Sequence, residues 1–429
     1  MTAARDTHIA IVGAGVAGLA AARLARAHGA RVTVLEARPR IGGRALTDDA
    51  SLGWTWDRGC HWLHCADINP FTRIADRLGF AYARTPPPEH VWLSGRWADR
   101  HVHAAWAATV AARSAAIAAA GESGRDVAAS ETLPPHDVWS DLFAQRLAVL
   151  TGAEPDRCST LDDTRYRDTG ANWPVRAGYG RLVARWAAGV PVHLNTPVQR
   201  IAWDGPGGVA LATPAGTLRA DQVLVTVPTS VLARGDIAFA PALPAAHRDA
   251  IAAVPLGGAN KVALRFDQDV FGTGMAHMTS RAHAPEGMAF QLLPFGRPLA
   301  IGYLGGRYAE RMEAEGPGAM VARAREILAD AFGSRVHRAV SAWAVTQWSG
   351  DPFSRGAYSI ALPGYAHRRR VLPEPVGGRL RFAGEACDLA HFGTVNAAYV
   401  SGRRAAAHAL DVPVPADAAH DGDPQHHHA

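Results

Sequence analysis

The chain has 429 residues, of which 48% are hydrophobic and 19% are charged, and this composition argues against a disordered or fibrous protein. Since one hydrophobic core seldom grows beyond about 250–300 residues, the length predicts two domains. The formal net charge is +5, but the basic residues form no run beyond 368–370 and accompany no nucleic-acid-binding module, so we expect a dispersed, solvated basic surface without a nucleic-acid partner.

The amino-terminal residues lead directly into a strand-like run at 8–12 without a charged and apolar leader, so no signal peptide is expected. No apolar stretch is long enough to span a bilayer, which argues against a membrane protein. The four cysteines lack a disulfide-framework spacing, and a chain of this size needs no disulfides. We therefore expect a cytoplasmic protein, and the sequence leaves the choice between monomer and homodimer open.

The first predicted elements form a βαβ unit. Residues 9–12 predict a buried strand, an Ala-, Leu- and Arg-rich helix follows to about residue 28, and residues 31–35 predict a second strand. The second strand ends at Glu36, whose carboxylate can accept hydrogen bonds from both hydroxyls of a ribose. This order of elements is typical of a dinucleotide-binding domain.

The turn between the first strand and the helix has the pattern G-x-G-x-x-G, formed by Gly13, Gly15 and Gly18. Gly13 permits the tight turn, Gly15 lets the backbone approach a pyrophosphate, and Gly18 allows close packing of helix on strand. The helix N-terminus attracts phosphate through its unpaired N–H groups and its dipole. The unit therefore predicts a site for FAD or NAD.

Residues 36–44 resemble the E-x-R-x-x-x-G-G-R extension of flavoproteins of the amine oxidase superfamily. Gly42 and Gly43 would let the backbone pass close to the pyrophosphate, and Arg38 and Arg44 would offset its charge. The alternative is a basic surface loop that follows an NAD site. The resemblance favours FAD.

Residues 57–64 resemble the D-x-G-(A)-x-W-I-H stretch of polyamine oxidases and related amine oxidases, which passes along the flavin ring. The resemblance implies that Gly59, His61 and Trp62 contact the cofactor and that His64 faces the substrate. A histidine that is merely packed is the competing interpretation of His64.

The same stretch also admits a zinc site made of Cys60, His61, His64 and Cys65. Four ligands within six residues cannot easily converge on one tetrahedral ion, and no second half-site follows at zinc spacing. We therefore expect no metal.

The middle of the chain continues the resemblance. Residues 172–182 are similar to the family's return into the FAD domain, and residues 197–201 to a short strand in which Val198 would meet the adenine. Residues 218–227 predict a further strand, and residues 237–251 match the segment that follows it in the family.

Lys261 is the only lysine in the chain, because the other 43 of the 44 Lys and Arg residues are arginine. An exposed cation can change between the two types at little cost, whereas a site that needs a compact ammonium cannot accept a planar guanidinium. Residues 257–266 resemble the motif G-x-x-x-K-V-x-L-x-F of the family, whose lysine holds a water against flavin N5. The resemblance implies the same role for Lys261.

Residues 348–358 resemble the family motif W-x-x-D-P-Y-S-x-G-(S/C)-Y. Trp348 would pack on the flavin and Tyr358 would form one wall of an aromatic substrate slot, although a pair of core aromatics is the alternative. Monoamine oxidases attach FAD through a cysteine where this chain has Ala357, so the resemblance implies noncovalent FAD.

Residues 381–386 resemble the F-A-G-E-A strand, which implies that Gly384 and Glu385 contact the cofactor, Glu385 at the ribityl chain. Thr394 and Val395 begin the last predicted helix, whose N-terminus would point at the flavin pyrimidine and favour negative charge there. Phe392 is the candidate for the second aromatic wall. The family usually has glycine where this chain has Ala397, so that assignment stays open.

The predicted fold is α/β, with a discontinuous FAD-binding Rossmann-type domain and a substrate-binding domain that contains a mixed sheet and helices. We expect the FAD-binding domain over residues 1–80, 175–255 and 375–412, the substrate-binding domain over residues 81–174 and 256–374, and a disordered tail over residues 413–429.

The predicted function is FAD-dependent oxidative deamination of a small amine. A hydride passes from the amine α-carbon to flavin N5, the imine is hydrolysed, and O2 is reduced to H2O2. The nearest alternative is an L-amino-acid oxidase, in which Arg96 or Arg100 would hold the substrate carboxylate. A flavin-binding module without turnover and an NAD-linked dehydrogenase are the alternatives from other classes.

Overall fold

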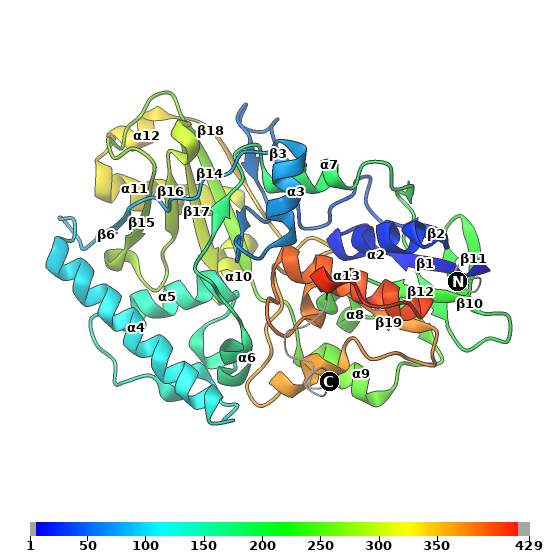
Figure 1. Ribbon diagram of the computed structural model, residues 1–429. Helices are drawn as coiled ribbons and strands as arrows, with labels where there is room; N and C mark the ends of the chain where they lie inside the picture. Colours follow the sequence, from blue (N-terminus) through cyan, green and yellow to red (C-terminus); the bar gives the residue numbers. More distant parts are fainter. Residues whose placement is uncertain (1–5, 419–429) are drawn as a thin grey trace.

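The computed structural model describes residues 6–418 of the chain (Figure 1). Its amino-terminal βαβ unit begins a five-stranded parallel sheet with the strand order β19-β12-β1-β2-β8. The central strand β1 is buried along its whole length, which explains its continuous apolar run. The strands of this sheet are β1 (His8–Val12), β2 (Arg31–Leu35), β8 (Val192–His193), β12 (Gln222–Val225) and β19 (Leu380–Phe382).

One face of this sheet carries α2 (Val16–Ala27) and α13 (Val395–Leu410), the blue and red helices that lie side by side in Figure 1. The two helices approach closely because Gly402 has no side chain, and a Cβ there would come within 2.1 Å of the Ala17 carbonyl oxygen. The first and last helices of the fold thus share one core.

The other face of the parallel sheet packs on a four-stranded sheet and two helices. These elements are β9 (Arg200–Ala202), β10 (Val209–Thr213), β11 (Gly216–Ala220), β13 (Ala238–Ala240), α8 (Thr229–Arg234) and α9 (Ala245–Ala253). The single strand predicted over 218–227 is therefore two strands in different sheets. The break falls at Asp221, whose carboxylate accepts the His8 N–H at 2.7 Å and turns the chain from one sheet to the other.

A six-stranded mixed sheet, with order β18-β14-β17-β16-β15-β6, forms the second half of the molecule. All neighbouring pairs are antiparallel except β15 and β6. Its strands are β6 (Glu89–Trp92), β14 (Ala259–Phe266), β15 (Ala276–Ser280), β16 (Ala289–Leu292), β17 (Leu299–Gly305) and β18 (Val340–Val345).

Two groups of helices accompany this sheet (Figure 1). One group packs its apolar side chains against the sheet: α10 (Gly306–Glu315), α11 (Pro317–Phe332) and α12 (Arg335–Ala339). The other group covers the lower edge in the view of Figure 1: α4 (Arg100–Glu122), α5 (Ser140–Thr151) and α6 (Thr160–Arg165). No helix within residues 6–418 is long and apolar enough to cross a membrane.

Two antiparallel two-stranded sheets and two further helices complete the fold. They are β3 (Thr47–Asp48) with β4 (Trp56–Asp57), β5 (Trp62–Leu63) with β7 (Trp173–Pro174), α3 (Pro70–Leu78) and α7 (Tyr179–Trp186). The four cysteines are unpaired.

The sequence-based domain boundaries stay a prediction, but each of the three larger sheets takes its strands from one predicted domain. Two segments cross the predicted division. Ala361, Ala366 and Leu372, assigned to the substrate-binding domain, pack in the core beside α9, and β7, assigned to the same domain, pairs with β5 of the FAD-binding domain. Residues 413–418 of the predicted tail also make contacts, because Asp417 pairs with Arg403 at 3.2 Å. The rest of that tail lies outside the described residues.

Candidate active site

A cavity of about 1070 Å³ runs from the parallel sheet to the six-stranded sheet and the helices α4 to α6. Pockets for drug-sized ligands span about 300–1,000 Å³, so this cavity slightly exceeds that range. The predicted site residues that line it are Gly13, Gly15, Glu36, Arg38, Gly42, Gly43, Arg44, Gly59, His61, Trp62, His64, Val198, Lys261, Trp348, Tyr358, Gly384, Glu385, Phe392, Thr394 and Val395.

Gly18 alone among the predicted site residues does not line the cavity. A Cβ at Gly18 would come within 2.0 Å of the Gly13 carbonyl oxygen, so this glycine serves the packing of α2 on the sheet. Gly13 itself has a φ of +103°, which favours glycine at the turn.

The turn before α2 fits a pyrophosphate. A Cβ at Gly15 would meet nothing within 4 Å, so the backbone there opens into the cavity. Gly15 also forms a backbone bridge to Gly42, which brings the second glycine pair against the turn. The N-cap of α2 is Gly15, with no side-chain hydrogen bond to the first turn, so its N–H groups are available to an anion.

Glu36 is 6% exposed and is held by the backbone at the end of β2. Its Oε2 accepts the Ala14 N–H at 2.7 Å and its Oε1 accepts the Arg38 N–H at 2.9 Å. Each carboxylate oxygen has a further lone pair for a ribose hydroxyl. The predicted contact with ribose therefore suits the geometry.

The two predicted pyrophosphate arginines both pair with carboxylates. Arg38 donates to both carboxylate oxygens of Asp351 at 2.8 and 2.5 Å, and Arg44 donates to Glu385 at 2.9 Å. Much of each positive charge is therefore balanced within the protein. The predicted contribution of these arginines to phosphate binding stays a prediction.

The carboxyl-terminal side of the cavity is built on Glu385 and the start of α13. Glu385 accepts the Ser359 hydroxyl at 2.6 Å and the Gly393 N–H at 2.8 Å. Burial alone would raise the pKa of Glu385, but the charge of Arg44 and the Ser359 hydrogen bond outweigh it, so the pKa is lowered. Thr394 caps α13 by accepting the Ala397 N–H at 3.1 Å. An ionised acid thus lies beside a helix N-terminus.

Lys261 lies on β14, and its ammonium is fixed by two carbonyl groups. Nζ donates to the carbonyl oxygens of Asp57 at 2.9 Å and Gly59 at 2.6 Å, and it lies 5.3 Å from the centre of the Tyr303 ring. A protonated lysine has three donors, so one remains for a molecule in the cavity. Burial lowers the pKa of Lys261 to about 8, although the charge of Asp57 opposes the shift.

The loop that holds Lys261 is itself fixed by the buried carboxylate of Asp57. Oδ1 accepts the Thr47 hydroxyl at 2.6 Å, and Oδ2 accepts the His61 imidazole at 2.9 Å and the Tyr179 N–H at 3.1 Å. Asp57 belongs to the motif at 57–64, but the sequence assigned it no role. Thr47 and His61 are close to it in sequence, whereas Tyr179 is 122 residues away, so the sequence alone did not reveal the whole set of contacts.

Trp62 forms an aromatic face of the cavity beside Lys261. Its ring lies 5.4 Å from that of Tyr303 and 6.4 Å from that of His277, neither of which the sequence predicted. Tyr303 is the cross-strand partner of Lys261 on β17, a register that no local motif reveals. Burial lowers the pKa of His277 to about 4, so the imidazole is neutral.

The predicted substrate histidine, His64, is hydrogen-bonded through Nδ1 to the side-chain oxygen of Asn172 at 2.6 Å. Burial lowers the pKa of His64, so the ring is neutral and donates this hydrogen bond. It lines the cavity, which is compatible with contact to a substrate, and its role stays a prediction.

Trp348 and Tyr358 line the cavity, and the Tyr358 hydroxyl donates to the Val149 carbonyl at 2.5 Å; their contacts with flavin and substrate stay predictions. Within the described part of the chain, Phe392 packs edge-on against Tyr166 at 5.2 Å and makes no ring contact with Tyr358. Tyr166 is thus a further aromatic of the cavity that sequence reasoning missed. The assignment of Phe392 as the second wall stays a prediction.

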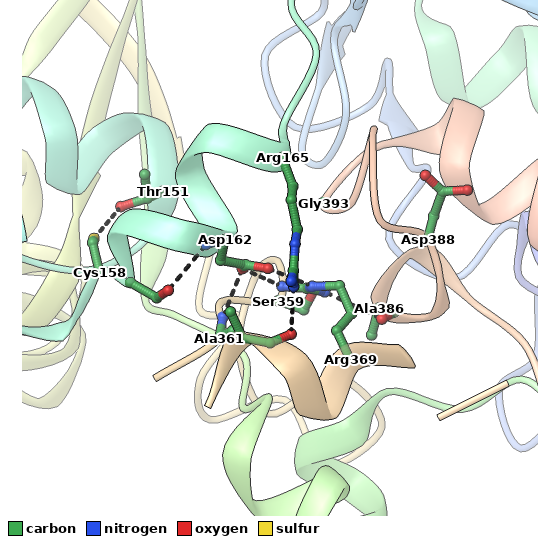
Figure 2. Close-up of polar contacts among 12 residues, drawn as sticks. Thr151, Cys158, Asp162, Arg165, Ser359, Ala361, Arg369, Ala386, Asp388 and Gly393 are labelled. Atoms are coloured by element: carbon green, nitrogen blue, oxygen red, sulfur yellow. Dashed lines mark hydrogen bonds and ion pairs between the residues drawn. The ribbon is translucent and has the colours of Figure 1, made fainter. Parts of the chain in front are cut away.

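A fully buried arginine, Arg369, links α6 to the segment that contains Ser359 (Figure 2). Arg369 donates to both carboxylate oxygens of Asp162 at 2.9 and 2.7 Å, and to Ser359 at 2.8 Å. Its guanidinium also lies 4.0 Å from the centre of the Phe392 ring. The run at 368–370 is therefore not wholly a solvated surface, since its middle residue neutralises a buried acid.

Two alternatives from the sequence receive no support from this geometry. Residues 6–418 contain no group of three or more histidine, cysteine and acidic side chains arranged to hold a metal ion. Arg96 and Arg100, the candidate clamps for an amino-acid carboxylate, are exposed and do not line the cavity.

The chain matches the family described as flavin containing amine oxidoreductase over residues 16–410. Among curated proteins it is 33% identical to Protein FLOWERING LOCUS D of Arabidopsis thaliana, over 93% of this chain and 55% of that protein. It is 29% identical to polyamine oxidase 4 of Oryza sativa subsp. japonica, over 93% of this chain and 87% of that protein. The chain spans about half the length of the first of these relatives, 55%.

Solved structures share the fold. Cyclohexylamine oxidase from Brevibacterium oxydans IH-35A superposes with a TM-score of 0.79 at 23% identity, covering 95% of this chain and 99% of that chain. Putrescine oxidase bound to putrescine gives 0.80 at 18% identity, covering 94% and 99%. The chain therefore belongs to the family of flavin-containing amine oxidoreductases, whose cofactor FAD the described cavity accommodates.

Proposed function

We propose that the chain catalyses the oxidative deamination of an amine with O2 as electron acceptor, using noncovalent FAD. The observation that carries the proposal is Lys261, the only lysine, buried in the same cavity as the phosphate-binding turn. FAD held in this cavity would supply the redox chemistry, which is acceptance of a hydride from the carbon beside the amine nitrogen and, with one further proton, reduction of O2 to H2O2. Ala357, at the position where related enzymes attach the flavin through cysteine, supports noncovalent binding.

The protein's own side chains would position the amine, exclude bulk water from the cavity and control proton transfer there. Trp62 and Tyr303 line the cavity next to Lys261, and Tyr358 lines it elsewhere; these aromatic side chains favour an amine in its neutral, apolar form. The free donor of Lys261 can hold one water there. Water is also the reactant that hydrolyses the imine, the product of amine oxidation, to a carbonyl compound and a released amine. The N-terminus of α13 favours negative charge on the cofactor side.

The type of amine is part of this proposal. The relatives include proteins named as polyamine oxidases and proteins named as lysine-specific histone demethylase homologues, one of them 32% identical to this chain. A methylated lysine side chain is thus a second candidate substrate, supported by that identity. The exposed positions of Arg96 and Arg100 give an L-amino acid less support.

A spectroscopic substrate panel tests the proposal. The purified protein, loaded with FAD, is mixed anaerobically with primary, secondary and poly-amines, L-amino acids and methyl-lysine peptides, and oxygen consumption is followed in parallel. We expect the flavin absorption to bleach with an amine and to return with O2 as peroxide forms. Flavin bands that no compound bleaches would make the protein a binding module, and a colourless protein that binds NAD would overturn the proposal.

A further inference from the structure

The wall of the cavity formed by α6 carries one carboxylate without a partner. Asp163 lines the cavity, and its side chain makes no hydrogen bond or ion pair with any residue of the described range 6–418. The charge of the neighbouring Asp162 is neutralised, because Arg369 donates to both of its carboxylate oxygens (Figure 2). Glu385, the buried acid on the cofactor side, is paired with Arg44 at 2.9 Å. Asp163 is therefore the uncompensated charge at this wall.

The surroundings of Asp163 make an unpaired charge costly. The helices α4 and α5 and the segment after Tyr358 line this part of the cavity with apolar side chains. These side chains are Trp106, Leu142, Phe143, Leu147 and Ile360. Burial and repulsion from Asp162 raise the pKa of Asp163 to about 6, so at neutral pH the group is mostly ionised. A half-buried charge of this kind is stabilised when a cation binds beside it.

We propose that Asp163 binds a second ammonium group of the substrate, so that the preferred substrate is a diamine or polyamine whose two cationic ends are joined by an apolar spacer. This inference rests on the proposed function and names its substrate class. Tyr166, the residue that directly follows α6, also lines the cavity, where its ring can add a cation–π contact. The apolar side chains of α4 and α5 suit the methylene spacer.

The same charge disfavours other substrates. A monoamine of equal length would leave Asp163 unpaired, and the carboxylate of an L-amino acid would be repelled by it. Diamines should therefore be preferred over monoamines with the same spacer.

The test compares matched pairs of substrates in wild-type protein and Asp163→Asn. Diaminobutane, diaminopentane and diaminohexane are set against butylamine, pentylamine and hexylamine, and kcat/KM is measured for each. We expect Asp163→Asn to lower kcat/KM for the best diamine by about 10- to 100-fold, the loss expected for one hydrogen bond to a charged group. The values for the monoamines should be unchanged or higher.

Asp141→Asn is the control. Asp141 is an exposed acid on α5 that does not line the cavity, and its carboxylate contacts the His136 imidazole at 3.2 Å. We expect its effect on the diamines to stay below about threefold, as is usual for surface substitutions. Equal losses with monoamines and diamines in Asp163→Asn, or no preference for diamines in the wild type, would overturn the inference.

Calorimetric titration separates this inference from the proposed function. Diaminohexane is titrated into the FAD-loaded wild type and Asp163→Asn, and this measurement needs no turnover. If no amine is oxidised, the proposed function fails, but an affinity about 10-fold or more weaker in the variant still supports Asp163 as the ammonium-binding residue. Equal affinities would refute it.

Discussion

At the scale of single residues, Lys261 combines a compact charge with a buried position. Its two carbonyl partners accept two N–H groups in either protonation state, and only the protonated form has a third donor for a water. Since burial lowers its pKa to about 8, that donor is present below this pH and is lost as the pH rises through it.

This titration predicts how the enzyme depends on pH. The re-oxidation of chemically reduced protein by O2 avoids the titration of the substrate amine and can be followed by stopped flow. We expect the re-oxidation rate to fall as the pH rises through about 8, and we expect no such fall in Lys261→Met. A decrease in rate with the same apparent pKa in both proteins would assign the titration to another group.

Two glycines of the first turn make a second prediction at this scale. A Cβ at Gly15 meets nothing within 4 Å, whereas a Cβ at Gly18 would come within 2.0 Å of the Gly13 carbonyl oxygen. We expect Gly15→Val to fold normally but to bind FAD at least about 10-fold more weakly, because the side chain enters the space of the pyrophosphate. Flavin fluorescence titration measures the affinity and circular dichroism measures the fold.

In contrast to Gly15→Val, we expect Gly18→Val to lose folded protein and not only its affinity for FAD. Normal FAD affinity in Gly15→Val would show that the pyrophosphate does not approach this turn.

At the scale of the elements, the helix α6 is joined to the 3-10 turn Ala366–Val371 by the ion pair of Asp162 and Arg369. Both side chains are buried, with 0% of Arg369 and 4% of Asp162 exposed, so removing one partner leaves an uncompensated charge. We expect Arg369→Met to lower the free energy of unfolding by about 3–5 kcal/mol. Chemical denaturation followed by tryptophan fluorescence measures the change.

Arg370→Met is the control, because Arg370 is adjacent to Arg369 but exposed. This variant should change the free energy of unfolding by no more than about 0.5 kcal/mol. Similar losses in both variants would show that the ion pair is not the source of the stability.

The elements also show what sequence reasoning can reach. The βαβ unit was predictable because its strand, turn and helix are encoded within residues 8–36, where periodicity and glycine spacing are local signals. The motif around Lys261 singled out a residue that lines the cavity, and its role stays a prediction. Asp162 and Arg369 are 207 residues apart, and Tyr303 reaches Lys261 only through the register of β14 and β17, so no local pattern revealed these contacts.

At the scale of the whole molecule, the cavity is a product of the topology. The five-stranded sheet contributes the phosphate-binding turn and Glu36, and the six-stranded sheet contributes Lys261 and Tyr303. Asp163 on α6 and Tyr166 directly after it complete the lining on the side of the helices. The fold class and the cofactor were predictable from local sequence motifs, whereas the residues at the substrate end of the cavity were found only in the structure.

The central claim is that Lys261 serves amine oxidation in a FAD-loaded cavity, and stopped-flow absorbance of the flavin tests it most directly. Wild-type protein and Lys261→Met, both loaded with FAD, are mixed with an amine without oxygen and then with O2. We predict that the wild type is reduced and re-oxidised rapidly. Lys261→Met should retain FAD but perform one of the two steps about 100-fold or more slowly, the magnitude typical of a positioned proton-transfer group. Rates that barely change in the variant would contradict the role assigned to Lys261.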